Sequence, residues 1–116
     1  MIIQNDSLRS NILIALSDKH MSKILEATSV CDRSVTNIIR EQDIPHSTIY
    51  RKIRQLLKFG LLVAYRSDII DGKKISYYKS TFRSFQINYD GTTRYKIEAI
   101  ANRDAIQRIS ERFYDL

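Results

Sequence analysis

The stretch DIPHSTIYRKIRQLLKFGLL, residues 43–62, decides the fold expected for this chain. Pro45 suits the first position of a helix, where a missing N–H leaves no hydrogen bond unmade, and Gly60 suits the position just after a helix ends. The apolar residues between them recur at helical spacing on one face: Ile49, Ile53, Leu56 and Leu57. The segment therefore predicts a helix that runs to about Phe59 and packs on other helices through this face.

Two shorter helices are expected before it. Ser17 or Asp18 is a plausible cap for the first helix, and Ser34 is a plausible cap for the second. Residues 29–33 between them predict a loop, and residues 42–44 predict a turn. Both helices carry apolar residues at helical spacing: Met21, Ile24, Leu25 and Thr28 in the first, and Val35, Ile38 and Ile39 in the second.

The N-terminal segment, residues 1–16, fits two structures. Asp6 or Ser7 could cap a short helix, whose apolar residues would be Leu8, Ile12 and Ala15. The run 12–14 would also suit a strand. We treat this segment as separate from the domain that follows, with a dimer arm as one role for it.

After Gly60 the apolar periodicity changes from that of a helix to that of a strand. Residues 61–67 and 75–80 predict two strands joined by a polar loop, residues 68–74. Three helices followed by a strand, a basic loop and a strand are the order of elements in a winged helix. We therefore assign residues 17–80 to a winged helix-turn-helix domain with a three-helix core and a β-wing.

A second β-hairpin and a terminal helix are expected in residues 81–116. The alternating apolar residues of the hairpin are Phe85, Ile87 and Tyr89, then Tyr95, Ile97 and Ala99. A three-residue loop, residues 90–92, would pair Ile87 with Tyr95 and Phe85 with Ile97 and keep these side chains on one face. A two-residue Asp-Gly turn would split that face. The whole chain is thus expected to be α+β.

The terminal helix should begin after Asn102, which is a plausible N-cap. Its apolar residues recur at helical spacing: Ala105, Ile106, Ile109, Phe113 and Leu116. They could cover the open face of the hairpin, or they could pair with a second copy of the chain. We favour a homodimer, with contacts from Ile106, Ile109 and Phe113.

Positive charge is concentrated in one part of the chain. Residues 44–83 hold nine basic and two acidic residues, so this segment carries +7 while the whole chain carries +6 and the remainder −1. A cationic segment of this kind predicts a localised surface for a polyanion. A solvated basic surface without a partner is the plainer alternative.

Residues 43–56, followed by Gly60-Leu61-Leu62, resemble the recognition-helix region of ArsR-like helix-turn-helix regulators, particularly archaeal ones. The resemblance covers roughly residues 17–80. It implies a sequence-specific regulator of transcription that binds double-stranded DNA, usually as a dimer. It also implies that a recognition helix, about residues 46–59, lies in the major groove.

Two groups of residues are therefore expected to contact DNA. The helix face opposite the core offers short polar side chains and then long cationic ones, which can reach base edges or phosphates. The wing would contact the backbone through its lysines. The expected DNA-binding residues are His46, Ser47, Thr48, Tyr50, Arg51, Arg54, Lys58, Arg66, Lys73 and Lys74.

Other function classes have weaker support. Cys31, expected to be a partly buried loop thiol, does not stand at a zinc-like spacing from His20 or His46, so we expect no metal and no cofactor. No catalytic motif is present, and we expect no enzyme. The longest apolar run, residues 12–16, is too short to span a membrane, and a cytoplasmic, nucleoid-associated location is expected. The alternatives are a winged-helix subunit that binds protein in a transcription assembly, and a nonspecific chromatin or architectural protein.

Overall fold

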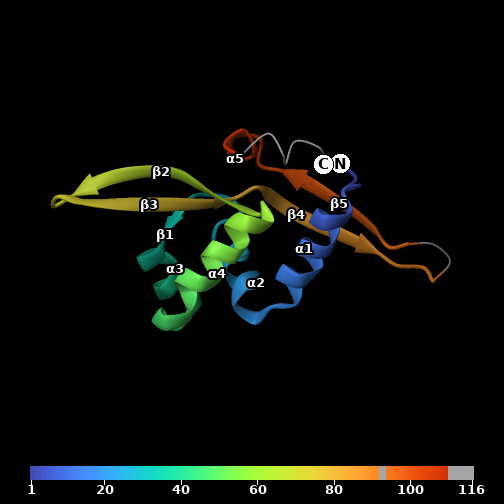
Figure 1. Cartoon of the computed structure of the whole chain (residues 1–116), viewed down its shortest axis with the longest axis horizontal. Helices are drawn as coiled ribbons and strands as arrows, with labels where there is room; N and C mark the ends of the chain where they lie inside the picture. Colours follow the sequence, from blue (N-terminus) through green and yellow to red (C-terminus); the bar gives the residue numbers. More distant parts are fainter. Residues whose placement is uncertain (92–93, 110–116) are drawn as a thin grey trace.

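The computed structural model describes residues 1–91 and 94–109, and within them the chain is α+β with two small antiparallel sheets. Figure 1 shows the longer helices grouped on one side of two β-hairpins, which point in opposite directions along the long axis. In chain order the elements are α1 (Asp6–Ser17), α2 (Lys19–Ala27), β1 (Arg33–Ser34), α3 (Val35–Gln42), α4 (His46–Phe59), β2 (Leu62–Ile70), β3 (Lys73–Ser80), β4 (Phe82–Asn88), β5 (Lys96–Ala101) and α5 (Arg103–Ile106).

The N-terminal segment is helical, which confirms the first of its two expected structures. The cap is Asn5 rather than Asp6 or Ser7, because the Asn5 side chain accepts a hydrogen bond from the N–H of Leu8 at 2.9 Å. The predicted apolar stripe of α1 is buried: Leu8, Ile12 and Ala15. These side chains belong to the same core as α2–α4, so α1 is packed into the domain.

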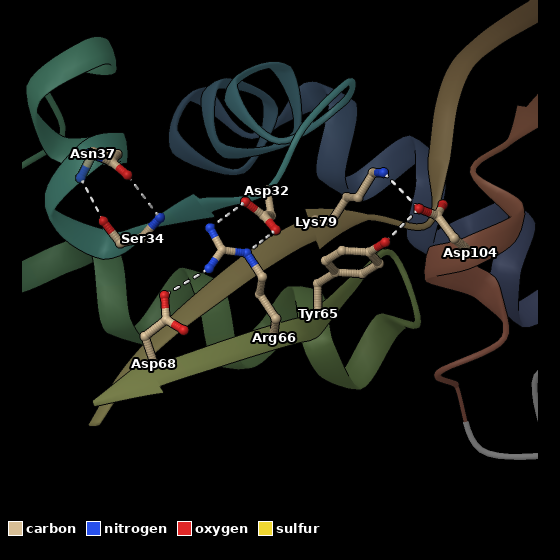
Figure 2. A network of polar contacts seen from close by, with 8 residues as sticks. All are labelled: Asp32, Ser34, Asn37, Tyr65, Arg66, Asp68, Lys79 and Asp104. Carbon is tan, nitrogen blue, oxygen red and sulfur yellow. Dashed lines mark hydrogen bonds and ion pairs between the residues drawn. The ribbon is translucent and has the colours of Figure 1, made fainter. Parts of the chain in front are cut away.

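Caps define the next helices much as expected. The Asp18 carboxylate accepts hydrogen bonds from the first N–H groups of α2, and Ser34 forms a reciprocal capping box with Asn37 at the start of α3 (Figure 2). Pro45 is the N-cap of α4 rather than its first residue, and Gly60 ends α4 with φ 76°. The expected loop at residues 29–33 ends in the short strand β1, which begins at Arg33 and pairs with β3.

One hydrophobic core holds the helices together. Ile12, Ile24, Ile38 and Ile49 are fully buried, one from each of α1, α2, α3 and α4. The same cluster continues into residues from both ends of the chain: Ile3, Phe82, Ile97 and Ala99. Segments 1–16 and 17–80 and the described part of segment 81–116 thus share a single core.

The first hairpin is longer, and its loop shorter, than the sequence predicted. β2 and β3 pair as far as Ile70 and Lys73, so only Asp71 and Gly72 form the turn. Both turn residues have positive φ, 52° and 75°, as a two-residue type I′ turn requires. The expected seven-residue loop was wrong because the Asp-Gly turn lets the strands continue pairing through residues whose polarity indicated a loop.

The second hairpin has a different register from the expected one. Ile87 pairs with Ile97 and Phe85 with Ala99, so the predicted pairing was wrong by two residues. The expected loop, residues 90–92, lies partly outside the described residues. A shift of two preserves the side of the sheet on which each side chain lies. Alternation therefore predicted the inner face correctly for Phe85, Ile97 and Ala99 but could not select the register. It was wrong for Tyr89, which lies beyond β4 and is 78% exposed.

The chain's beginning lies along β5. The N–H of Ile3 donates to the carbonyl of Ile97 at 2.9 Å, and the N–H of Ala99 donates to the carbonyl of Met1 at 2.7 Å. The buried Arg9 guanidinium donates to the carbonyls of Ile3 and Tyr95 and lies 4.2 Å from the centre of the Tyr95 ring. Arg9 thereby joins α1, the N-terminus and the segment before β5.

No helix among the described residues is long and apolar enough to cross a bilayer.

Replacing Ile53 with Ala should destabilise the protein by about 2–5 kcal/mol, because it leaves a cavity beneath α4. Ile53 is 2% exposed, whereas Ile14 on α1 is 49% exposed. Chemical denaturation of both variants checks the effect. Ile14→Ala is the matched control, with an expected change within about 0.5 kcal/mol. Equal losses in the two variants would contradict the core described above.

Candidate nucleic-acid interface

The surface of α4 that faces away from the core is polar and cationic. Its exposed residues are His46, Ser47, Tyr50, Arg51, Arg54 and Lys58. Thr48 is half-buried, as its position beside the buried face requires. This exposure follows from helical geometry, because burial of Ile49, Ile53 and Leu56 turns the intervening residues toward solvent.

The basic residues of α4 differ in their partners. In the described part of the chain, Arg51, Arg54 and Lys58 make no ion pair. Lys52, by contrast, donates to the Asp18 carboxylate at 2.6 Å and is largely buried. Burial would raise the pKa of Asp18, but hydrogen bonds from Lys52 and from the N–H groups of Met21 and His20 outweigh it, so the pKa is lowered. Lys52 therefore joins α4 to the cap of α2.

The first turn of α4 also favours negative charge. Pro45, the N-cap, offers no side-chain hydrogen bond to the N–H groups that begin the helix. Such N–H groups, together with the helix dipole, attract phosphate. His46 and Tyr50 lie one turn apart at this end, with ring centres 5.7 Å apart in an edge-to-face arrangement. The start of α4 thus presents hydrogen-bond donors and an aromatic pair together.

The lysines of the first hairpin lie near its end. Lys73 and Lys74 are the first two residues of β3, not loop residues as expected, and both are exposed. Like Arg51, Arg54 and Lys58 of α4, they make no ion pair with any other described residue. Asp71 in the adjoining turn is also exposed, so residues 69–74 carry a net charge of +1.

A small cavity brings α4 and the hairpin together. It measures about 210 Å³ and has one wall from α4, through Tyr50, and another from β3, through Lys74. The start of α3 forms the remaining wall, through Val35 and Thr36, residues that the sequence did not indicate as part of a site. The structure therefore places the expected recognition helix and the expected wing on one continuous surface.

The Arg66 guanidinium forms two ion pairs within the protein. Figure 2 shows its guanidinium between two carboxylates, with Nε 2.7 Å from Asp32 and Nη1 2.9 Å from Asp68. It also stacks 3.8 Å from the centre of the Tyr77 ring. Asp32 precedes β1, so this contact holds β1 against the hairpin. No local sequence signal could identify it, because Asp32 and Arg66 are 34 positions apart.

A second cluster on the hairpin involves Asp104 of α5. The Tyr65 hydroxyl and the Lys79 ammonium donate to this carboxylate at 2.7 and 3.0 Å (Figure 2). The hydrogen bond from Tyr65, and then that from Lys79, lower the pKa of Asp104 to about 2. Arg108 stacks on the Tyr65 ring at 4.5 Å. The cluster fastens α5 to the base of the hairpin.

The residues expected to form a dimer contact are only partly described. Ala105 is buried and Ile106 packs against the monomer core, which agrees with the alternative that this segment covers the core. Ile109 is half-buried, and Phe113 lies outside the described residues. Asn102 occupies the N-cap position of α5, but its side-chain amide donates to the carbonyls of Ser29 and Ser80 instead of capping the helix. The homodimer stays a prediction.

Residues 1–91 and 94–109 include both histidines, the cysteine and most of the acidic residues of the chain. No three side chains among His, Cys, Asp and Glu there are placed to hold a metal ion. Cys31 is exposed, not partly buried as expected, because it lies in the turn between α2 and β1.

Comparison with known proteins adds no relative: no protein-family model, no curated protein and no solved structure matches the chain. The case for its function therefore depends on its own residues and their geometry.

The pKa of Asp104 should rise from about 2 toward 3.8 in a Tyr65→Phe variant, which loses the hydroxyl that donates to the carboxylate. Because the pKa of Asp104 in the folded protein lies below the ordinary value of an aspartate, ionised Asp104 stabilises the fold above about pH 4, and this contribution disappears as the pH falls toward 2. A carbon-13 NMR titration of the carboxyl group measures the shift. Tyr77→Phe is the control and should leave this pKa unchanged; an unaltered value in Tyr65→Phe would show that the hydroxyl does not stabilise the carboxylate.

Proposed function

We propose that this chain is a winged-helix protein that binds double-stranded DNA sequence-specifically and regulates transcription. The observation that carries the proposal is the cavity shared by Tyr50 of α4 and Lys74 of β3. Through this cavity, α4 and β3 form one surface. Each of the two elements has exposed cations that make no ion pair in the described chain. A polyanion can contact both elements at once.

The order and pairing of the elements support a winged helix. Helices α2, α3 and α4 are followed by the β2–β3 hairpin, and β1 between α2 and α3 completes a three-stranded sheet in the order β1-β3-β2. In this arrangement α4 is the recognition helix and β2–β3 is the wing. We accordingly assign α4 to the major groove, which is wide enough to admit a helix.

Each exposed residue then has a role set by its length and charge. Ser47 and Tyr50 lie at the start of α4, where the backbone approaches the groove most closely. Arg51 and Arg54 are long enough to donate two hydrogen bonds to guanine, the commonest specific contact in the major groove. Lys73 and Lys74 contact phosphates, which supply affinity without sequence preference.

Ion pairs within the protein remove one residue, Arg66, from the DNA-binding residues expected from the sequence. Arg66 lies between Asp32 and Asp68 and would have to break two ion pairs to bind phosphate. Its role in the proposal is to hold the hairpin in place. Lys79, tied to Asp104, has the same supporting role.

Binding of another protein through the α4 surface is the main alternative. The centres of protein–protein interfaces are depleted of charge as a whole, although aromatic residues, Met and Arg are enriched there. The exposed α4 surface has three cations, no acidic residue and no aliphatic residue, which favours a polyanion.

Arg51→Ala and Arg54→Ala should each weaken binding to a preferred duplex, obtained by selection from a random DNA library, by about 5- to 150-fold. The reason is the loss of a base contact, so binding to a scrambled duplex should fall much less. Fluorescence anisotropy with both duplexes measures the two affinities. Arg103→Ala removes an exposed arginine from α5 and should bind both duplexes as the wild type does. Wild-type affinity and preference in the Arg51 and Arg54 variants would contradict the assigned recognition helix.

The double variant Lys73→Ala/Lys74→Ala should bind all duplexes more weakly and reduce the slope of log affinity against log salt by about two, because two phosphate contacts are lost. Titrations between about 50 and 200 mM salt supply the slope. The control is Lys96→Ala, which removes an exposed lysine from the other hairpin. If the double variant kept the wild-type slope, the wing would not contact the backbone.

A further inference from the structure

The end of the β2–β3 hairpin is an arm that pairs with no other strand of the described chain. The last pairing of the hairpin with β1 is at Tyr77, opposite Ser34. Beyond it, β2 and β3 pair only with each other, from Ser67 opposite Ser76 to Ile70 opposite Lys73. Four strand residues make an arm of about 13 Å. Figure 1 shows it projecting past the helices at one end of the molecule.

The arm carries two large apolar side chains in solvent. Ile69 is 79% exposed, the highest value among the large hydrophobic residues described, and Ile70 is 50% exposed. They are adjacent in β2, so they lie on opposite faces of the ribbon, next to the turn. Their strand partners are Lys74 and Lys73, respectively. Each face of the tip therefore has one isoleucine directly across from one lysine.

This combination indicates the chemistry of the partner. Apolar contact alone would suit a protein, but both isoleucines are accompanied by lysines that make no ion pair within the described chain. Lysines at the rim of a small apolar tip match a surface that is anionic outside and apolar within. A DNA groove has this character, with phosphates along its edges and stacked bases at its floor.

Resting on the proposed DNA-binding function, we infer that the arm is a wedge that kinks the duplex, with Ile69 or Ile70 inserted from the minor groove between base pairs. Apolar side chains inserted in this way unstack a base step and bend DNA by about 20–90°. Lys73 and Lys74 hold the flanking phosphates. This activity goes beyond the backbone contact assigned to the wing above.

The dimensions of the arm support insertion over simple contact. Its strands are about 4.8 Å apart before side chains are added. The undeformed minor groove is about 6 Å wide, so the ribbon can enter only at its tip and only by widening the groove. A two-residue turn makes the tip narrow and rigid, since Asp71 and Gly72 are the only unpaired residues there. Rigidity reduces the conformational entropy lost when the tip inserts.

The test measures bending separately from binding. A linear mixed-sequence duplex of about 120 base pairs is shorter than the persistence length of DNA, about 150 base pairs, and is seldom closed into a circle by ligase. At about 50 mM salt the wild-type protein should raise the rate of circle formation at least tenfold, since each kink brings the duplex ends closer. The Ile69→Thr/Ile70→Thr double variant should lose this increase. Its affinity for the same duplex, measured by gel shift, should fall by less than about fivefold.

Threonine preserves β-branching and strand propensity while removing the apolar tip. The matched control is Ile100→Thr, which changes an isoleucine of β5 that is 61% exposed and lies on the other hairpin. It should promote circle formation as the wild type does. Thermal unfolding of both variants verifies that they are folded.

The outcomes separate this inference from the proposed function. If the folded double variant promotes circles as well as the wild type, the isoleucines are not a wedge. If the wild-type protein binds the duplex with the expected dependence on Arg51 and Arg54 but never promotes circles, the wedge fails while DNA binding stands. If the wild type does not bind duplex at all, both proposals fall.

Discussion

Burial of the apolar face of α4 is the constraint on which the rest of the structure depends. Ile49, Ile53 and Leu56 are each at most 2% exposed and pack against the other helices. Rotation of α4 about its axis would expose these side chains, at a cost of about 1.5–3 kcal/mol for each one transferred to water. The core therefore sets which residues face outward. The cationic surface is a consequence of packing and helical geometry, and no contact of its own is needed to orient it.

Acidic residues then divide the basic ones into two groups. Three basic residues of the segment 44–83 form ion pairs with distant carboxylates. The pairs are Lys52 with Asp18, Arg66 with Asp32, and Lys79 with Asp104. These pairs join α4 to α2, β1 to the hairpin, and α5 to the hairpin's base. The other basic residues of the segment 44–83 make no ion pair with any described residue. They lie on the outer side of α4, near the hairpin tip and at the start of β4: Arg51, Arg54, Lys58, Lys73, Lys74 and Arg83. The ion-paired residues thus hold the elements of the fold together. The basic residues without ion pairs are available to a partner.

The hairpins extend from a core that includes both ends of the described chain. Ile3 and Ile97 are fully buried in it, and Arg9 links the N-terminal segment to the residues before β5 through backbone carbonyls. This arrangement fastens the second hairpin to α1. The end of the first hairpin is different, because its last four residue pairs, from Ser67–Ser76 to Ile70–Lys73, make strand pairings only with each other. The end of this hairpin therefore extends beyond the helices (Figure 1).

The sequence by itself determined the features that depend on neighbours within about four positions. Ser34 and Asp18 as caps, Gly60 as the end of α4, and the buried stripes of the helices all follow from local hydrogen bonds and from helical periodicity. Alternation also predicted the apolar face of the second hairpin. Only the tertiary structure decided its register, since a shift of two leaves that face intact. The ion pairs of the basic residues could not be predicted from the sequence either. Lys52 and Arg66 pair with carboxylates 34 positions away, and Lys79 pairs with one 25 positions away. Such pairs depend on how the elements pack, which local pattern does not encode.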